Sequence, residues 1–424
     1  MEAGNKAGKA RFADQAAIRG LVCEIVARVC RQQLAQSLRS LLLTGSLARE
    51  EATVLPHPGG CRMLGDADFI AVFERHAPLP AAGAVAALTA QCESALRAAG
   101  VIAHVGMAVV YDDYFRRLPA HILTYELRCC GRIVCGDETS LALIPRFPAS
   151  AIDKEDAWRL LANRTIECLE LSRVRSPAPV QANANLPSDD LHYRTVKLFL
   201  DMATSLLVFV DAYEPTYAQR AQKLTQLAER LPEQARPPFA MRVFAGCVDQ
   251  CTRWKLAPRG DGIPNKDGVG LLGCNGRTAD SEIAREAFDY ACRLWRWELA
   301  QLTSTGPEAS PETLFADMAA RQSAWQKFRG WLYVARRTGW LRSVRAWPRW
   351  MRMAFDRTPR YYVYEAAWRL AVNDDCPLDQ ADIRRIRALL PVAGRDDQGV
   401  AAPREQLIRE LVWNYQTFLM ETRA

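Results

Sequence analysis

The segment from Leu41 to Phe73 holds residues whose types and spacing suit phosphate and metal chemistry. Three consecutive leucines, ending at Leu43, predict a buried strand that breaks into a turn at Gly45-Ser46 and then begins a helix. Glycine lets a phosphate approach the backbone closely, and N–H groups at a helix start attract negative charge. The turn therefore predicts an anion site.

Asp66 and Asp68 open the second apolar run of this segment, which predicts a strand from Asp66 to Phe73. Side chains two residues apart on a strand leave the same face of the sheet. Two adjacent carboxylates repel each other unless a cation lies between them. Carboxylate oxygens that face a phosphate turn are the ligands with which Mg²⁺ holds a nucleoside triphosphate. The spacing thus predicts a magnesium site.

A Gly-Ser turn followed by Asp-x-Asp on the next strand resembles the signature of the DNA polymerase β-like nucleotidyltransferase superfamily. The resemblance implies that Gly45 and Ser46 grip the triphosphate of an NTP, with ATP the first expectation. It also implies that Asp66 and Asp68 bind two Mg²⁺ ions. A third carboxylate is expected from a later strand.

Two features depart from that signature. The gap between the Gly-Ser turn and the Asp-x-Asp pair is longer than in the commonest members, and residues 53–63 are expected to form an extra hairpin or loop. Glu50 stands where many members carry glycine in a Gly-Ser-x-x-Arg-Gly-Glu run. Arg49 and Glu51 match that run, so the resemblance implies that Arg49 belongs to the nucleotide-binding turn.

Glu126 is the candidate for the third carboxylate. It lies among apolar neighbours in a segment, His121 to Arg128, that we expect to be a strand paired with Arg132 to Cys135. A charge there is costly unless it is paired or metal-bound. By its similarity to bacterial nucleotidyltransferases, Glu126 would bind the catalytic metal or act as general base. A Glu on the solvated face of an edge strand is the alternative. The rival pair Asp112-Asp113 is better explained as a turn.

A further group of polar residues lies on a helix predicted to begin near Leu191. Tyr193, Lys197 and Asp201 follow one another at intervals of four, so they share one face of that helix. By the same resemblance Lys197 contacts the β- or γ-phosphate, and Arg220, beyond a Tyr-x-Pro-x-Tyr turn, supports it. The alternative is a surface ladder of ion pairs, each worth under about 0.5 kcal/mol.

Helical and strand patterns alternate from residue 15 to about residue 140, and helical patterns follow. The sequence therefore predicts an α+β fold with a small mixed sheet followed by mostly α-helical domains. We expect a nucleotidyltransferase domain at 1–150, a helical domain closing the nucleotide cleft at 151–303 and a basic, Trp-rich helical region at 312–424. Residues 255–280 are rich in glycine and expected to be irregular. Their Gly-x-Gly-x-x-Gly match is therefore interpreted as a loop and not as a dinucleotide site.

The composition, 49% apolar and 24% charged, is that of an ordinary globular protein. No apolar run reaches the roughly 20 residues of a membrane span, and the N-terminus lacks the apolar centre of a secretory signal. The 13 cysteines form no Cys-x-x-Cys pair, which predicts reduced thiols and disfavours a zinc site. These features lead us to expect a cytoplasmic protein.

Positive charge is concentrated in residues 321–360, which contain eleven Lys or Arg and one acid, Asp356. Five tryptophans alternate with the arginines there. This segment has three interpretations. The segment is a solvated basic face whose tryptophans belong to the core, a platform for RNA or another polyanion, or a helix lying on an anionic membrane surface.

Together these expectations describe a Mg²⁺-dependent nucleotidyltransferase that moves NMP from an NTP to a hydroxyl acceptor and releases pyrophosphate. The sequence does not indicate the base preference, nor whether the acceptor is a small molecule, a protein side chain or an RNA end. The alternative is a catalytically weak NTP-binding sensor or scaffold that docks through its basic helical tail. Pyrophosphate release separates the two.

Overall fold

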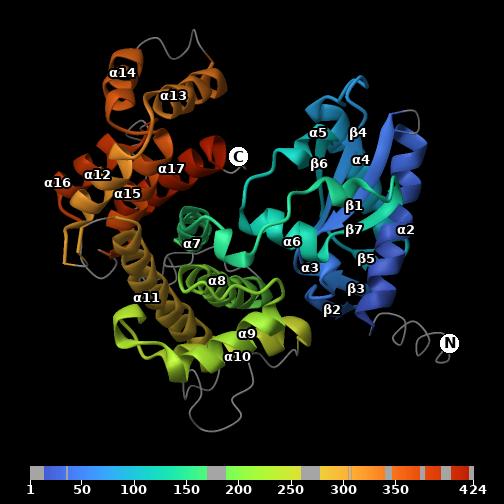
Figure 1. Cartoon of the computed structure of the whole chain (residues 1–424), viewed down its shortest axis with the longest axis horizontal. Coiled ribbons are helices and arrows are strands. Elements are labelled where there is room, and N and C mark those ends of the chain that lie inside the picture. Colours follow the sequence, from blue (N-terminus) through green and yellow to red (C-terminus); the bar gives the residue numbers. More distant parts are fainter. Residues whose placement is uncertain are drawn as a thin grey trace. The chain divides into compact units, whose positions relative to one another are not determined.

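The structure is a computed structural model that describes residues 14–34, 37–169, 188–258, 277–303, 305–306, 308–339, 346–372, 378–392 and 403–419. The chain forms two compact units, which are described separately (Figure 1). Unit 1 takes its residues from Met1–Ala157, Ser188–Ala235 and Ala240–Leu271, and unit 2 from Trp158–Pro187, Arg236–Phe239 and Leu272–Ala424. A mixed α+β fold with a small N-terminal sheet is confirmed.

Unit 1 is built on a four-stranded sheet in the order β6-β4-β1-β7. The central strand β1 runs antiparallel to both of its neighbours, whereas β4 and β6 are parallel. The strands are β1 (Leu38–Thr44), β4 (Ala67–Phe73), β6 (Val105–Tyr111) and β7 (Arg132–Gly136). The predicted strand before Gly45-Ser46 is therefore confirmed. The strand predicted from Asp66 to Phe73 is confirmed as well, except that it begins at Ala67.

Helices cover both faces of this sheet (Figure 1). Alternate side chains of β1 reach opposite faces: Leu41 and Leu43 pack with α2 (Gln15–Leu34) and α4 (Ala82–Ala98). Leu42 lies on the other face, in a smaller cluster with residues of α5 (Asp113–Arg116), α6 (Ile122–Cys130) and the 3₁₀ segment Ser140–Leu143. Burial on both faces explains the uninterrupted leucine run of β1.

The long gap between the Gly-Ser turn and the Asp pair forms a small second sheet. A hairpin of β2 (Val54–His57) and β3 (Gly60–Met63) fills it, and β5 (Val101–Ile102) pairs in parallel with β3. The hairpin expected at 53–63 is thus confirmed. Gly60 is required at its tip, because a β-carbon there would lie 1.8 Å from the carbonyl oxygen of Gly100.

The strand expected from His121 to Arg128 is wrong: this segment is the helix α6. The local sequence ILTYE suggested a strand, but tertiary contacts decide for a helix. The side chain of Asp156 accepts a hydrogen bond from the first helical amide, Ile122 N, at 2.9 Å. Gly131 ends the helix, and a β-carbon there would lie 2.3 Å from the carbonyl oxygen of Leu127. Arg132 to Cys135 is a strand as expected, within β7.

Three further helices belong to unit 1, so unit 1 extends beyond the domain boundary expected at residue 150. They are α8 (Ser188–Phe209), α9 (Tyr217–Arg230) and α10 (Met241–Leu256), with a 3₁₀ turn at Glu233–Ala235. The helices pack on one another. Lys255 lies in α10 and not in the irregular segment expected from residue 255, whereas residues 259–276, including the glycine-rich match, lie outside the described residues.

Unit 2 is helical in its described parts, as expected for the C-terminal region. Its helices are α7 (Lys154–Cys168, from Trp158 on), α11 (Arg277–Leu302), α12 (Pro311–Ala320), α13 (Ala324–Thr338), α14 (Trp347–Asp356), α15 (Pro359–Val372), α16 (Gln380–Leu389) and α17 (Pro403–Phe418). Buried Trp158 contacts the rings of Trp295 and Tyr364 at the centre. Among the described helices of both units, none has the length and apolarity needed to cross a membrane.

Candidate functional site

The carboxylate of Asp68 lies in a notch between two glycines at the end of the sheet. Asp68 pairs with Thr44 on β1 and with Gly106 on β6. A β-carbon on Gly45 would lie 2.8 Å from Oδ2 of Asp68, and one on Gly106 would lie 2.6 Å from Oδ1. Gly45 also has φ +70°, a conformation that favours glycine. The Gly-Ser turn and the second aspartate are thus brought together as the sequence predicts.

Asp66 directly precedes β4 and is exposed. Ala67, between the two aspartates, is buried in the core formed with α2 and α4. Strand alternation therefore directs the carboxylate of Asp68 to the opposite face, the one that α6 covers further along the sheet. One aspartate is open to solvent, and the other is held against the Gly-Ser turn.

Helix α8 brings a tyrosine to this turn. A β-carbon on Gly65 would lie 2.7 Å from the Tyr193 hydroxyl and 4.0 Å from Oγ of Ser46. The predicted face of Tyr193, Lys197 and Asp201 is therefore helical and begins beside the Gly-Ser turn. Asp201 is buried and Lys197 is half-buried.

Glu126 lies in a different environment from the two aspartates. Its carboxylate forms ion pairs with Arg49, at 2.5 Å, and with Arg220, and it accepts a hydrogen bond from the Tyr213 hydroxyl at 2.7 Å. The side chains of Arg49 and Arg220 are only 4% and 2% exposed. Glu126 lies in α6 and contacts two other parts of unit 1. Through Arg49, the C-cap of α3 (Gly45–Ala48), it is linked to the Gly-Ser turn, and through Tyr213 and Arg220 it is linked to the α8–α9 turn and to α9.

The protonation states of this cluster follow from its charges. Burial alone would raise the pKa of Glu126, but Arg49, Arg220 and the hydrogen bond from Tyr213 outweigh it and hold that pKa below its usual value. Burial and the adjacent Glu126 carboxylate raise the pKa of Tyr213 well above its usual value. Glu126 is thus a carboxylate and Tyr213 a neutral donor at neutral pH, a fully paired arrangement.

Arg220 is held by further acceptors besides Glu126. Its guanidinium donates to the Thr204 hydroxyl at 2.8 Å, and to the carbonyl oxygens of Glu214 and Pro215. The guanidinium carbon also lies 4.6 Å from the ring centroid of Tyr213 and 5.0 Å from that of Tyr217. This side chain, which the resemblance assigns to phosphate support, holds the turn between α8 and α9 through these contacts.

Arg49 and Glu51 form a second link to α9. Glu51 is 4% exposed and accepts hydrogen bonds from the backbone amides of Tyr217 and Ala218, the first two residues of α9. Arg49 donates to Glu51 at 3.1 Å. An anionic side chain at a helix start stabilises the helix. Arg49, expected at the nucleotide, therefore orients the Gly-Ser turn against α9.

Glu50 explains one departure from the resemblance. Its φ is +62°, so this residue occupies the left-handed region that glycine adopts most readily. The turn keeps the glycine-like conformation with a glutamate in place. Glu50 forms ion pairs with Arg19 and Arg132, which link it to α2 and β7.

Lys255 is a candidate that sequence reasoning missed. It is 1% exposed, its ammonium donates to the Thr53 hydroxyl at 3.1 Å, and it lies 5.4 Å from the ring centroid of Tyr193. Burial, followed by the positive charges of Lys197 and Arg49, lowers its pKa to about 7. A signal was present: Cys247, Cys251 and Lys255 recur at intervals of four on the apolar face of α10, where a lysine is unusual.

Few acidic side chains lie near the Gly-Ser turn in the described strands. Within the described ranges, no group of three or more His, Cys, Asp or Glu side chains is arranged to hold a metal. The four strands of the sheet contain one acid, Asp68, and Gly106 occupies the adjacent place on β6. Mg²⁺ is commonly held by one or two carboxylates completed by substrate phosphates and water. Asp66 and Asp68 are two carboxylates of this kind.

No family model matches the chain, and no curated protein matches it.

Proposed function

We propose that unit 1 is a Mg²⁺-dependent nucleotidyltransferase, which transfers NMP from an NTP, ATP first among them, to a hydroxyl acceptor and releases pyrophosphate. The observation that supports this most directly is the notch of Asp68. Its two carboxylate oxygens occupy the space that side chains at Gly45 and Gly106 would need. A carboxylate next to a Gly-Ser turn, with a second carboxylate two residues before it, is the arrangement that a metal-bound triphosphate requires.

The chain's own residues would position the nucleotide. Gly45 lets the phosphates approach the backbone, and the Ser46 hydroxyl donates a hydrogen bond to a phosphate oxygen. Asp66 and Asp68 would hold the Mg²⁺ that enters with the NTP, and the ion would neutralise phosphate charge during transfer. Lys197 supplies positive charge from the same helix as Tyr193, which reaches the turn.

In the proposed enzyme Glu126 positions the Gly-Ser turn against α9 and is neither a metal ligand nor the general base. Its charge is balanced by two arginines, and the cluster joins the Gly-Ser turn to α9. Arg49 and Arg220 likewise act through Glu51, Glu126 and Tyr213. Positioning matters in phosphoryl chemistry because small displacements of the reacting groups cost large factors in rate.

A second candidate function is favoured by the same cluster. The described strands bring no third carboxylate beside Asp68, and Glu126 is paired with two arginines. Such a protein would bind Mg²⁺-NTP without turnover and act as a sensor or scaffold. Nucleotide binding that depends on Asp68 but releases no pyrophosphate would favour it.

The experiment is transfer of label from each of the four α-³²P-labelled NTPs, with Mg²⁺, using the purified full chain with and without cell extract. Label on a metabolite, protein or RNA, lost in Asp66→Asn, supports the transferase and identifies the acceptor by its mass. Glu74→Gln is the matched control, since Glu74 is an exposed acid that directly follows β4, whereas Asp66 directly precedes it. Transfer that persists in Asp66→Asn would rule out the proposed site.

A further inference from the structure

Helix α14 in unit 2 has apolar side chains on two sides. Trp350 and Met353 are buried, and the indole N–H of Trp350 donates to the carbonyl oxygen of Pro391 at 2.8 Å. Trp347, Met351 and Phe355 recur at intervals of four on the exposed side of the helix. A helix on a protein surface normally shows polar residues there, so this stripe is unusual.

The exposure of this stripe is large. Phe355 is 81% exposed, Met351 48% and Trp347 37%. Each such side chain leaves apolar surface in water, and leaving it exposed costs about 25 cal/mol of free energy per Å² relative to burying it. Apolar side chains that are exposed together mark interaction sites more often than single exposed ones do.

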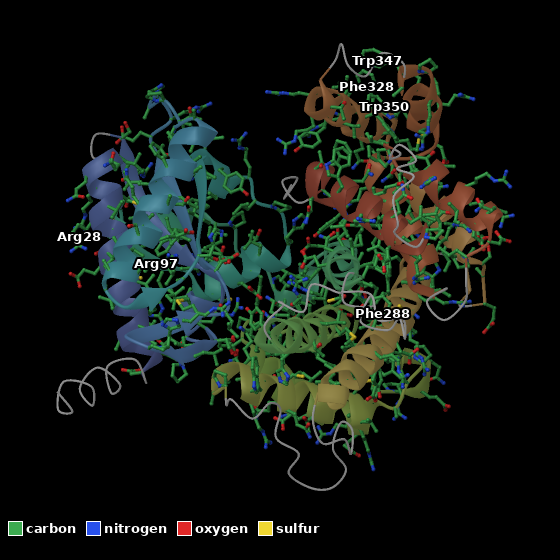
Figure 2. All side chains as sticks on the ribbon, turned by 180° about the vertical axis from the view of Figure 1, so that it is seen from behind. Arg28, Arg97, Phe288, Phe328, Trp347 and Trp350 are labelled. Carbon is green, nitrogen blue, oxygen red and sulfur yellow. The ribbon has the colours of Figure 1, made fainter. Side chains whose placement is uncertain are left out.

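Helix α13 packs beside α14 and adds two more exposed aromatic rings. Trp331 of α13 lies 6.2 Å from Trp350 of α14, ring centroid to ring centroid. Trp325 is 65% exposed and Phe328 45% exposed. Figure 2 shows Phe328 and Trp347 at the same end of unit 2, on these two helices. We call Trp325, Phe328, Trp347, Met351 and Phe355 the aromatic tip.

Basic residues are frequent in the segments that carry the aromatic tip. The described parts of 321–360 contain nine Lys or Arg and one acid, Asp356. That acid is paired with Arg357. Arg321, Arg329 and Arg352 are exposed on or next to α13 and α14, and Arg349 instead donates to carbonyl oxygens at the end of α16. The described parts of this segment therefore offer apolar and cationic groups with a single acid among them, which fits an anionic partner.

We propose that the aromatic tip binds the surface of an anionic lipid bilayer. Tryptophan and arginine are suited to the boundary between head groups and acyl chains, where an apolar body and a polar or charged end are both satisfied. Met351 favours a bilayer over a nucleic acid, because its thioether offers no flat ring for base stacking, whereas acyl chains accept every member of the stripe. The lipid phosphates would contact the exposed arginines.

The proposal is tested by co-sedimentation of the full chain with vesicles of phosphatidylcholine alone or mixed with phosphatidylglycerol. We expect binding to the anionic vesicles about tenfold stronger than to the neutral ones, falling as salt rises. The double variant Met351→Ser/Phe355→Ser should reduce binding by about tenfold, since both side chains are exposed and their loss leaves the fold intact. Val243→Ser/Val372→Ser removes two exposed apolar residues elsewhere and is expected to bind as the unaltered chain does.

A second measurement fixes the class of partner. Binding of a fluorescent single-stranded RNA is followed by anisotropy at the same ionic strength. RNA binding without vesicle binding would overturn the proposal in favour of a nucleic acid. Absence of binding to anionic vesicles, or equal vesicle binding by the Met351→Ser/Phe355→Ser variant, would overturn it as well. These outcomes do not depend on nucleotide transfer by unit 1.

Discussion

A β-carbon on Gly106 would lie 2.6 Å from Oδ1 of Asp68, so β6 leaves room for this carboxylate only because residue 106 is glycine. Gly106→Ala should displace the Asp68 side chain, the more flexible of the two groups, while the strand keeps its register. We expect weaker Mg²⁺-NTP binding, by about tenfold, with a thermal midpoint nearly unchanged. Ala108→Ser, an exposed position on the same face of β6, is the control. Unaltered Mg²⁺-NTP affinity in Gly106→Ala would contradict the importance of the notch.

Glu126→Gln is expected to affect stability more than metal binding. The change leaves Arg49 and Arg220 buried with less compensating charge, which costs on the order of 3 kcal/mol. Hydrogen exchange of unit 1 peptides in increasing urea measures this loss, and Glu229→Gln, in an exposed pair with Arg242, should have little effect. If Glu126 is a metal ligand, we expect the opposite result: Glu126→Gln keeps the stability of unit 1, and the Mg²⁺ concentration needed for nucleotide binding rises.

Lys255 should make the stability of unit 1 depend on pH. Its pKa is about 7 in the folded state and about 10.5 when unfolded. Both states bind the proton below pH 7, so the cost of burying the ammonium is complete there. The unfolded state alone stays protonated between about pH 7 and 10.5, and the free energy of unfolding therefore rises with pH across that window.

Lys255→Met removes this dependence. We expect the variant to be more stable than the unaltered chain at pH 6 to 7 by about 2 kcal/mol, after loss of the bond to Thr53, and the difference to shrink toward pH 10. Urea unfolding at several pH values measures it. Lys154→Met, at a partly exposed lysine paired with Asp211, is the control. A variant less stable at every pH would show that Lys255 is buried without an electrostatic cost.

Substitutions of Glu50 test the backbone geometry of the turn that follows Gly45-Ser46. Glu50→Gly and Glu50→Ala both remove the ion pairs with Arg19 and Arg132, but only glycine relieves the left-handed backbone at φ +62°. Glu50→Gly should therefore be more stable than Glu50→Ala by about 1 kcal/mol. The comparison of thermal midpoints measures it, and equal midpoints would mean that the turn relaxes to another conformation.

The sequence predicts the core of the candidate site well because its signals are local. The Gly45-Ser46 turn, the strand that carries Asp68 and the hairpin between them are all encoded within the segment Leu41 to Phe73. Periodicity and turn residues are sufficient for such short-range features.

The rest of the site depends on contacts that are distant in sequence. Glu126 contacts Arg220, 94 residues away in the sequence, and Arg49, 77 residues away. The residues next to Glu126 in the sequence therefore do not distinguish a metal ligand from an ion-paired carboxylate. The segment of Glu126 also folds as a helix where its β-branched and aromatic residues suggest a strand. Lys255 meets Thr53 across 202 positions, and only the apolar pattern of α10 marks it.

Nucleotide transfer at Asp68 is tested most directly by measuring Mg²⁺-dependent release of pyrophosphate from NTP. The assay compares the full chain with its Asp68→Asn and Glu74→Gln variants, and cell extract is added as a source of acceptor. Pyrophosphate release that is lost by about a thousandfold in Asp68→Asn and kept in Glu74→Gln is the predicted result. Release at equal rates in both variants would contradict it, and would place any nucleotide chemistry of this protein away from the notch between Gly45 and Gly106.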